Sequence, residues 1–171
     1  MDDLKQFIRE VQNFPKEGIL FYDITTMLKN AKALRMTVDR FVWIFSDQHV
    51  DKVIGIESRG FMFGPIVAYD LNAGFVPVRK PGKLPAKTVG RSYDLEYGSD
   101  RVEMHEDAIE MGERVLIVDD LLATGGTARA TAELVTSQGG QVVGLGFIVE
   151  LEFLAGRDKL TKYPVESLIV Y

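Results

Sequence analysis

The sequence of 171 residues contains no cysteine, and this absence excludes several kinds of chemistry. Without thiols the chain can form no disulfide, bind no metal through thiolates and use no cysteine nucleophile. Only two histidines are present, and neither has neighbours at the spacing of metal ligands, so we expect no metal centre built from side chains. A chain without cysteine suits a reducing compartment, and we therefore expect a cytoplasmic protein.

Long apolar runs and an excess of basic residues are also missing. No stretch approaches the ~20 apolar residues of a membrane-spanning helix, so we expect no association with membranes. The net charge of −5, from 25 acidic and 20 basic residues, argues against nucleic acid as the main partner. The chain is 46% hydrophobic and has no repeats or linkers, so residues 1–171 are predicted to form a single domain.

Strand and helix patterns alternate along the chain. Strands are predicted at 52–56, 75–78, 115–118, 142–149 and 167–171, and helices at 4–11, 34–45, 61–71, 127–138 and, in short form, 151–160. Asn30 is placed to cap the helix over 34–45. Residues 91–97 and 101–105 are predicted to pair as a hairpin. This alternation is typical of an α/β fold with a mostly parallel central sheet flanked by helices.

The segment 115–128, with the sequence VLIVDDLLATGGTA, carries the clearest functional signal. Two carboxylates, Asp119 and Asp120, follow the buried strand, and a loop rich in glycine leads into the next helix. The N–H groups of such a loop and of the helix N-terminus can bind a phosphate. The carboxylates can accept hydrogen bonds from two neighbouring hydroxyls, such as a ribose diol. The pattern predicts a site for a phosphorylated sugar.

Other interpretations of this loop are weaker. A P-loop ends in Gly-Lys-Ser/Thr, whereas Gly126 is followed by Thr127 and Ala128. No G-x-G-x-x-G follows a strand, so the dinucleotide fingerprint is absent. The remaining alternative is that the acids are polar residues at a strand end and the glycines only form a turn. A turn of this kind needs a helix cap and one glycine, not two adjacent acids followed by Ala-Thr-Gly-Gly-Thr.

A basic segment follows the predicted strand at 75–78. Five cations and no acidic residue lie between residues 78 and 93, namely Arg79, Lys80, Lys83, Lys87 and Arg91. In parallel α/β sheets, ligands bind beyond the carboxyl ends of the strands. We therefore expect this segment, the loop 57–60 and the loop 119–127 to meet at one sheet edge, where a ribose with phosphate at both ends would fit. The alternative is a solvated surface loop.

Residues 118–127 resemble the motif with which type I phosphoribosyltransferases bind phosphoribosyl diphosphate (PRPP), in the form found in the adenine-specific members. Four further segments resemble the same family in the same order, so that the resemblance covers essentially the whole chain: 14–24, 57–64, 79–85 and 92–98. Two positions depart from the family pattern, since Glu17 replaces a second proline and Tyr22 stands where arginine is frequent.

The resemblance implies transfer of the 5-phosphoribosyl group from PRPP to N9 of adenine, giving AMP and diphosphate, a step of purine salvage. It further implies a type I phosphoribosyltransferase fold with a small hood from about 1–30 and the C-terminal segment. A mobile lid over about 81–108, a homodimer, and Mg²⁺ held mainly through PRPP rather than by protein ligands are also implied.

Residue roles follow from the same resemblance. Asp119 and Asp120 would hold the ribose hydroxyls, and the 5′-phosphate would be held by Ala123, Thr124, Gly125, Gly126 and Thr127. The diphosphate would be bound by Ser58, Arg59, Arg79, Lys80 and Lys83, with Arg79 donated by a neighbouring subunit. Leu20 and Phe21 would form the adenine pocket, Phe21 by stacking. Glu96 and Tyr97 would lie on the closing loop, Glu96 as the candidate for proton transfer.

Two rival functions remain open on the sequence. One is a phosphoribosyltransferase for hypoxanthine, guanine, xanthine or a pyrimidine. The other is a PRPP-sensing regulator or RNA-binding protein that keeps the fold without catalysis. A regulator of that kind usually carries a DNA-binding extension or a basic face, and neither is recognisable in this chain.

Overall fold

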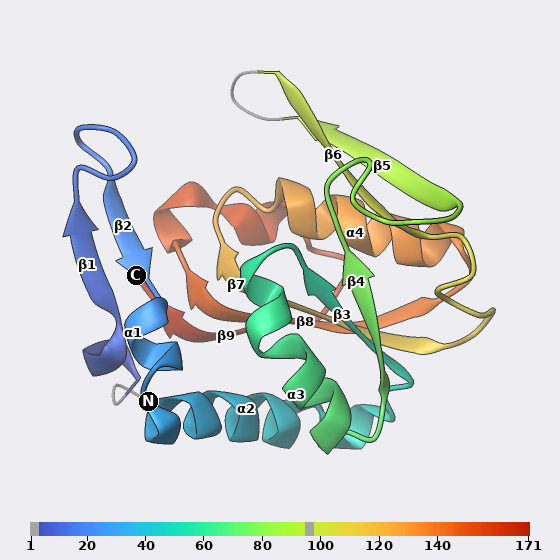
Figure 1. Cartoon of the computed structure of the whole chain (residues 1–171), viewed down its shortest axis with the longest axis horizontal. Coiled ribbons are helices and arrows are strands. Elements are labelled where there is room, and N and C mark those ends of the chain that lie inside the picture. The colour runs from blue at the N-terminus through green and yellow to red at the C-terminus, as the bar shows by residue number, and fades with distance from the viewer. Residues whose placement is uncertain (1–3, 95–97) are drawn as a thin grey trace.

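The computed structural model describes residues 4–94 and 98–171. Its centre is a five-stranded sheet in the order β4-β3-β7-β8-β9, and every neighbouring pair is parallel (Figure 1). The strands are β3 (Lys52–Ile56), β4 (Gly74–Val78), β7 (Arg114–Leu122), β8 (Gln141–Glu150) and β9 (Val165–Val170). The predicted α/β fold with a parallel sheet is confirmed.

Helices cover both faces of this sheet (Figure 1). The elements α1 (Thr25–Leu28), α2 (Ala31–Phe45) and α3 (Gly64–Asp70) lie on one side, and α4 (Gly126–Ser137) lies on the other. Each side has its own apolar core, one centred on Phe41 and Phe63 and the other on Ile117 and Phe147. Because both faces of the strands are covered, the segment 115–118 is wholly buried, as its unbroken apolar run predicts.

Local signals place several of these elements. The Asn30 side chain accepts a hydrogen bond of 3.0 Å from the Ala33 N–H, so Asn30 caps α2 as predicted. Short 3₁₀ turns connect the regular elements: η1 (Lys5–Phe7), η2 (Ser46–Gln48), η3 (Arg59–Met62), η4 (Glu152–Leu154) and η5 (Gly156–Lys159). The predicted helices at 61–71 and 151–160 are thus shorter or irregular. In the described part of the chain, no helix has the length and apolar character needed to cross a membrane.

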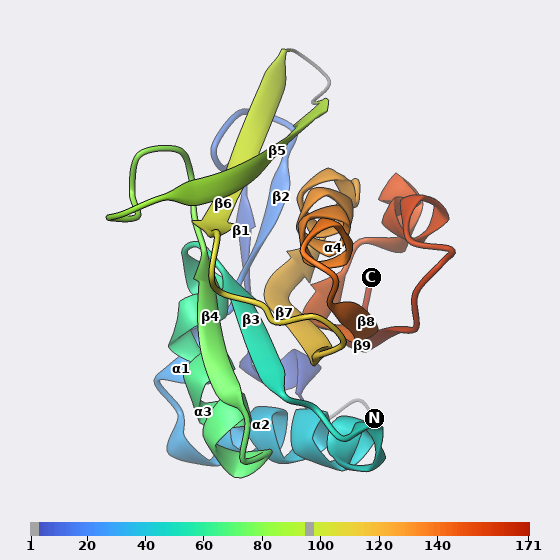
Figure 2. The same ribbon diagram turned by 90° about the vertical axis from the view of Figure 1, so that its right-hand side faces the viewer.

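Two antiparallel hairpins project beyond the central sheet, one at the left and the other at the upper right of Figure 1, and both reach above the sheet in Figure 2. The first pairs β1 (Arg9–Gln12) with β2 (Leu20–Asp23). The second pairs β5 (Thr88–Asp94) with β6 (Ser99–His105), which confirms the predicted hairpin although its strands begin and end at different residues. The second hairpin packs over the start of α4, where a methyl group on Gly126 would come within 3.0 Å of the Tyr93 ring.

The helix predicted over 4–11 is wrong. Leu4, Phe7, Ile8 and Val11 have helical spacing, but only one 3₁₀ turn forms, and Arg9–Gln12 is the strand β1. The cause is tertiary: Leu4 is buried in the core on the α2 side, whereas Val11 faces Phe21 across the β1–β2 pair. A continuous helix could not satisfy both sets of contacts.

Candidate functional site

The carboxylate pair lies on the central strand rather than beyond it. β7 continues through Asp119 and Asp120 to Leu122, because Leu121 and Leu122 still pair with β8. Asp120 is buried, with 5% of its surface exposed, and Asp119 is half-buried. The Asp120 N–H donates a hydrogen bond of 2.9 Å to Asp119 Oδ1, which holds the first carboxylate against the strand end.

The surroundings of these acids favour their neutral forms. Burial, reinforced by the charge of Asp120, raises the pKa of Asp119 well above its usual range. Burial also raises the pKa of Asp120, and Arg59 partly offsets this effect. Two carboxylates in a desolvated position repel each other unless cations or hydroxyl groups approach them. The pair is therefore suited to receive hydrogen-bond donors from a ligand.

The loop after β7 forms a small cradle. A cavity of about 80 Å³ is lined by the loop residues Ala123, Thr124, Gly125, Gly126 and Thr127, together with Asp119, Leu121, Leu122 and Ala128. Gly125 has a φ of 76°, a left-handed conformation that suits glycine, and it occupies the N-cap of α4. No described side chain caps this helix. Its first N–H groups are therefore directed at the cradle, where they can bind an anion.

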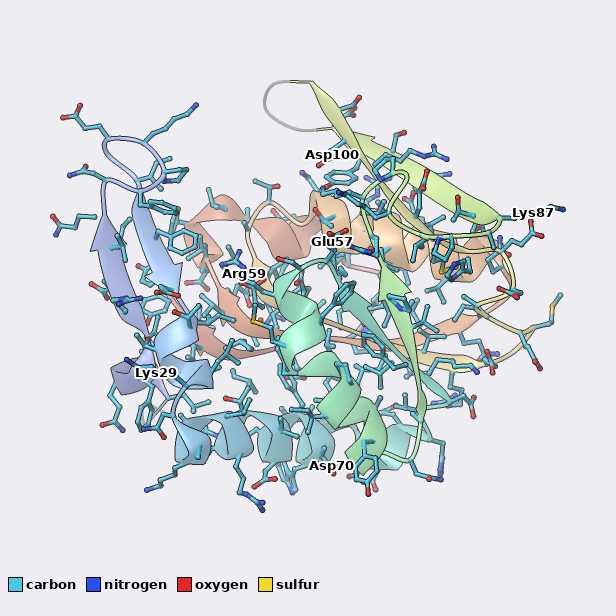
Figure 3. All side chains as sticks on the ribbon, in the orientation of Figure 1. Lys29, Glu57, Arg59, Asp70, Lys87 and Asp100 are labelled. Carbon is cyan, nitrogen blue, oxygen red and sulfur yellow. The ribbon has the colours of Figure 1, made fainter. Side chains whose placement is uncertain are left out.

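The loop after β3 reaches the acids of β7. Arg59 Nε lies 3.0 Å from Asp120 Oδ2, and the Arg59 guanidinium lies 5.4 Å from the centre of the Phe21 ring. A methyl group on Gly60 would lie 3.0 Å from the Val118 carbonyl oxygen and 3.3 Å from Asp119 Oδ1, so the two backbones are closely packed here. Figure 3 shows Arg59 between the two hairpins. Arg59 thus connects the acids of β7 to Phe21 of β2. Ser58 beside it is exposed.

The cations after β4 are held by acids of the same chain. Arg79 donates to Glu57 through Nη2 and Nε, at 2.9 and 3.1 Å, and the Lys80 N–H donates to Glu57 at 3.1 Å. Hydrogen bonds from Arg79 hold the pKa of Glu57 below its usual value. The Lys80 ammonium donates to Asp100 and, at 2.9 Å, to the Tyr93 hydroxyl.

The remaining cations of the basic segment separate from one another. Lys83 is exposed, and its carbonyl accepts a hydrogen bond of 3.0 Å from Arg79. Arg91 pairs with Glu133 of α4 at 2.7 Å. Lys87 lies at the far end of the hairpin, where it pairs with Glu106 (Figure 3). Of the five cations of the basic segment, Arg79 and Lys80 lie beside the loop after β3, where both donate hydrogen bonds to Glu57.

The β1–β2 hairpin supplies an aromatic wall. The Phe21 and Phe14 rings meet edge to face at 5.1 Å, and Leu20 beside them is exposed. Tyr22 points the other way, as alternation along a strand requires, and its ring stacks on Tyr171 at 3.9 Å. The departure at Tyr22 therefore lies on the far side of β2 from Arg59. The other departure, Glu17, lies in the exposed turn between β1 and β2.

Several features of this region were missed from sequence. Glu57 and Tyr93, which bind the cations, carried no signal beyond their place in family-like segments. Asp100 was placed only between the two strands of the predicted hairpin. Phe14 was noted only as part of such a segment. Two predicted site residues, Glu96 and Tyr97, lie outside the described residues. No group of three or more potential metal ligands occurs within 4–94 and 98–171.

A parallel sheet whose central strand ends in a carboxylate pair, a glycine loop and an uncapped helix defines a phosphoribosyltransferase-type domain. The model of the phosphoribosyl transferase domain family matches residues 25–169. The adenine phosphoribosyltransferase of Solibacter usitatus is 61% identical over 171 residues, covering 100% of this chain and 99% of the relative. That of Koribacter versatilis is 55% identical, covering 99% and 93%.

Solved structures with a similar fold belong to the same family. The adenine phosphoribosyltransferase of Thermoanaerobacter pseudethanolicus has a TM-score of 0.96 and 51% identity, with 99% of both chains covered. The enzyme from Saccharomyces cerevisiae, in complex with an imino-altritol 1,6-bisphosphate and adenine, has a TM-score of 0.93 and 43% identity, covering 98% of this chain and 97% of its own. The present chain belongs to the adenine phosphoribosyltransferase family.

The raised pKa values of Asp119 and Asp120 predict how stability depends on pH. A carboxyl whose pKa is higher in the folded state stabilises that state below its unfolded pKa, and this contribution is lost as pH rises through the folded pKa. We expect the contribution of this pair to the free energy of unfolding of the ligand-free protein to fall from about pH 4 upward. It is measured in urea as the difference between the wild type and the Asp119→Asn/Asp120→Asn double variant, so that the carboxyls with lowered pKa values cancel.

Asp23 provides a control, because its pKa is shifted in the opposite direction from those of Asp119 and Asp120. Burial raises its pKa, but hydrogen bonds from Arg9 and Thr25 outweigh this and lower the pKa to about 2. Its contribution is present above its unfolded pKa and lost as pH falls toward 2, so Asp23→Asn should destabilise the protein at neutral pH and have little effect at pH 2. A difference between wild type and the double variant that does not change with pH would contradict the environment described for the β7 acids.

Proposed function

We propose that the enzyme transfers the 5-phosphoribosyl group of PRPP to N9 of adenine and releases AMP and diphosphate. The observation that carries this proposal is the convergence, at the carboxyl end of β7, of diol-binding acids, a phosphate cradle and an arginine packed on Phe21. The names of the relatives, and the adenine and bisphosphate bound by the yeast enzyme, support the same choice of substrates.

In the proposed reaction, N9 of adenine forms a bond to the anomeric carbon as the bond from that carbon to the diphosphate oxygen breaks. The ribose gains oxocarbenium character, and the proton of N9 is lost. The protein has little covalent chemistry to perform, so its contribution is positioning and charge stabilisation. Asp119 and Asp120 hold the ribose hydroxyls, the loop 123–127 holds the 5′-phosphate, and Phe21 with Leu20 contacts the base.

The diphosphate is assigned to Ser58, Arg59, Arg79, Lys80 and Lys83. In the described structure, Arg59, Arg79 and Lys80 already have carboxylate partners, respectively Asp120, Glu57 and Asp100. Binding of diphosphate is therefore an exchange of anionic partners. Such an exchange avoids leaving a cation desolvated and unpaired before the ligand arrives. Arg79 is assigned to the diphosphate of a neighbouring subunit, which requires it to leave Glu57.

The residues present fit magnesium bound mainly through the substrate. Mg²⁺ prefers oxygen ligands and is usually held by one or two carboxylates together with substrate phosphates. Asp119 offers a half-buried carboxylate beside the cradle, whereas Asp120 is engaged by Arg59. When bound, the ion neutralises charge on the leaving diphosphate.

Exclusion of water is assigned to a lid over about 81–108 and a hood from about 1–30 with the C-terminal segment. Water in the closed site would hydrolyse PRPP, so closure protects the substrate as well as strengthening electrostatic contacts. Glu96 and Tyr97 belong to this lid, and Glu96 is assigned the transfer of the N9 proton. The absence of cysteine suits work in the reducing cytoplasm.

A homodimer is part of the proposal. A groove of about 400 Å³ between α2 and α3 is lined by the apolar residues Leu34, Val38 and Ile66 and by the charged residues Arg35, Asp39 and Asp70. Nearby on α3, Tyr69 is 83% exposed. A twofold interface must be complementary to itself, and a patch that carries both signs of charge around apolar residues meets this condition. The occupant we assign to it is a second copy of the chain.

Sedimentation equilibrium tests the dimer. The wild type is expected to have twice the mass of the chain, and Ile66→Glu should shift it toward the monomer because a carboxylate would be buried in the interface. Met111→Glu, at an exposed apolar residue away from α3, is the control and should remain dimeric. A monomeric wild type, or an Ile66→Glu variant that stays dimeric, would contradict the assignment.

Base preference tests the substrate. We expect kcat/KM for adenine to exceed that for hypoxanthine and guanine by about tenfold or more, because a pocket that hydrogen-bonds the adenine amine leaves buried groups unpaired against a 6-oxo purine. The assay supplies PRPP, Mg²⁺ and each base in turn and measures the mononucleotide. Equal or better turnover of guanine would remove the adenine assignment but retain the class of reaction.

The lid prediction separates an enzyme from a PRPP sensor. Glu96→Gln should lower kcat by about 10²–10⁴-fold, the usual contribution of general acid–base catalysis, while PRPP affinity measured by calorimetry stays nearly unchanged. Glu106→Gln, directly after β6 and paired with the exposed Lys87, is the control. Parallel loss of PRPP binding would place Glu96 in the ground-state site. A wild type that binds PRPP but converts no base would favour the sensor.

A further inference from the structure

A short segment after β8 lies directly against the phosphate cradle. A methyl group on Gly156 would overlap the backbone oxygen of Ala123 and come within 3.0 Å of Leu122 Cδ1. In return, a methyl group on Gly125 would overlap the carbonyl oxygen of Gly156 and lie 3.2 Å from its Cα. The two backbones therefore touch with no side chain between them, and Gly156 forms the outer support of the loop 123–125.

This supporting segment has little regular structure of its own. It consists of the turns η4 and η5, joined at Ala155, whose φ of 51° is left-handed and unusual for alanine. Single 3₁₀ turns are weakly stabilised by their own hydrogen bonds. The position of Gly156 must therefore depend on tertiary contacts. They include the backbone hydrogen bonds from Leu151 N–H to the Leu122 carbonyl and from Glu152 N–H to the Tyr171 carbonyl, at 2.9 and 3.0 Å, the burial of Leu160, and the contacts of Arg157.

Arg157 fastens the segment to the two last strands of the sheet. Its Nε donates to both oxygens of Glu150, at 2.7 and 3.0 Å, and its Nη1 donates to the Val165 carbonyl at 2.8 Å. Its Nη2 lies 3.4 Å from the Ser167 hydroxyl. Glu150 ends β8 and is 4% exposed, while Val165 and Ser167 belong to β9. The planar guanidinium thus joins three elements in one fixed geometry.

Electrostatics also stabilise the ion pair between Glu150 and Arg157. Burial raises the pKa of Glu150, but hydrogen bonds from Arg157 and Ser167 outweigh this and keep the pKa below its usual value. Glu150 is therefore ionised at neutral pH, and a buried carboxylate without its cation is strongly disfavoured. The guanidinium is engaged with β8 and β9 rather than with the cradle, so neither side chain is placed to touch a phosphate.

We propose that Glu150 and Arg157 are positioning residues for the phosphate cradle, which they stabilise by pressing Gly156 against Ala123 and Gly125. The inference rests on the proposed function, because the ligand of the cradle is taken to be the 5′-phosphate of PRPP. N–H groups bind a phosphate only when several converge on it, so a shift of the loop weakens all of them together. A misplacement of about 1 Å can cost about 100-fold.

The test uses Gly156→Ala and Arg157→Lys. The alanine retains the ion pair but pushes the loop, whereas the lysine retains the charge but cannot bind Glu150, Val165 and Ser167 at once. For both variants we expect KM for PRPP to rise by about tenfold or more, with KM for adenine nearly unchanged. Arg157→Ala should exceed Arg157→Lys in its effect, because lysine still neutralises Glu150.

Two controls separate this role from general destabilisation. Gly74→Ala adds a methyl group that meets chiefly the flexible Lys52 side chain, and Lys52→Ala removes an ion pair with Glu113 away from the cradle. Both are expected to leave KM for PRPP nearly unchanged. Circular dichroism and thermal midpoints show whether each variant is folded at the assay temperature.

Binding of ribose 5-phosphate, measured by calorimetry, distinguishes failure of the inference from failure of the proposed function. If the wild type binds ribose 5-phosphate but converts no adenine, the proposed function fails and the cradle can still be tested. If folded Gly156→Ala or Arg157→Lys binds ribose 5-phosphate as tightly as the wild type, the positioning role is wrong. Weaker binding in both variants, with unchanged binding in both controls, supports it.

Discussion

The site depends on one constraint: two adjacent acids, Asp119 and Asp120, lie near the carboxyl end of the central strand β7, where they are largely removed from solvent. Asp120 is almost fully buried, and burial raises the pKa values of both acids. The neighbouring elements bring compensating groups to these acids. Arg59 supplies a cation, and Gly60 permits close approach of the β3 loop. The first turn of α4, which no described side chain caps, lines the same cavity as Asp119.

The cations of the site are likewise paired with groups of opposite charge. Burial lowers the pKa of Lys80, yet hydrogen bonds to Asp100 and Tyr93 outweigh it and raise the pKa. Arg79 is held by both oxygens of Glu57. These partners lie on different elements, so the ion pairs also fix the loop after β4 relative to β3 and to the β5–β6 hairpin. In the proposed reaction, diphosphate replaces partners that are already present, which lowers the cost of assembling so much charge.

The sequence predicted the centre of the molecule well and its periphery poorly, for physical reasons. β3, β4 and β7 are buried on both faces, so their apolar runs and the polar residues that follow them carry strong local signals. The helix predicted over 4–11 was wrong because Val11 pairs with β2 instead of continuing a helical face. The contacts Tyr22–Tyr171, Lys80–Asp100 and Arg59–Phe21 join residues far apart in the chain, and no local pattern specifies them.

In the proposed function, the same division separates recognition of the phosphoribosyl group, at the centre, from recognition of the base, at the periphery. The positions proposed for the ribose and the 5′-phosphate lie at β7, the start of α4 and the segment at Gly156. The position proposed for the base lies at the β1–β2 hairpin, where Phe21 faces Arg59 while Tyr22 stacks on Tyr171. A hairpin attached at a sheet edge can change its residues at little cost to the core. Selection of the base can therefore vary without disturbing the machinery that holds the phosphoribosyl group, and the two must be tested by different substitutions.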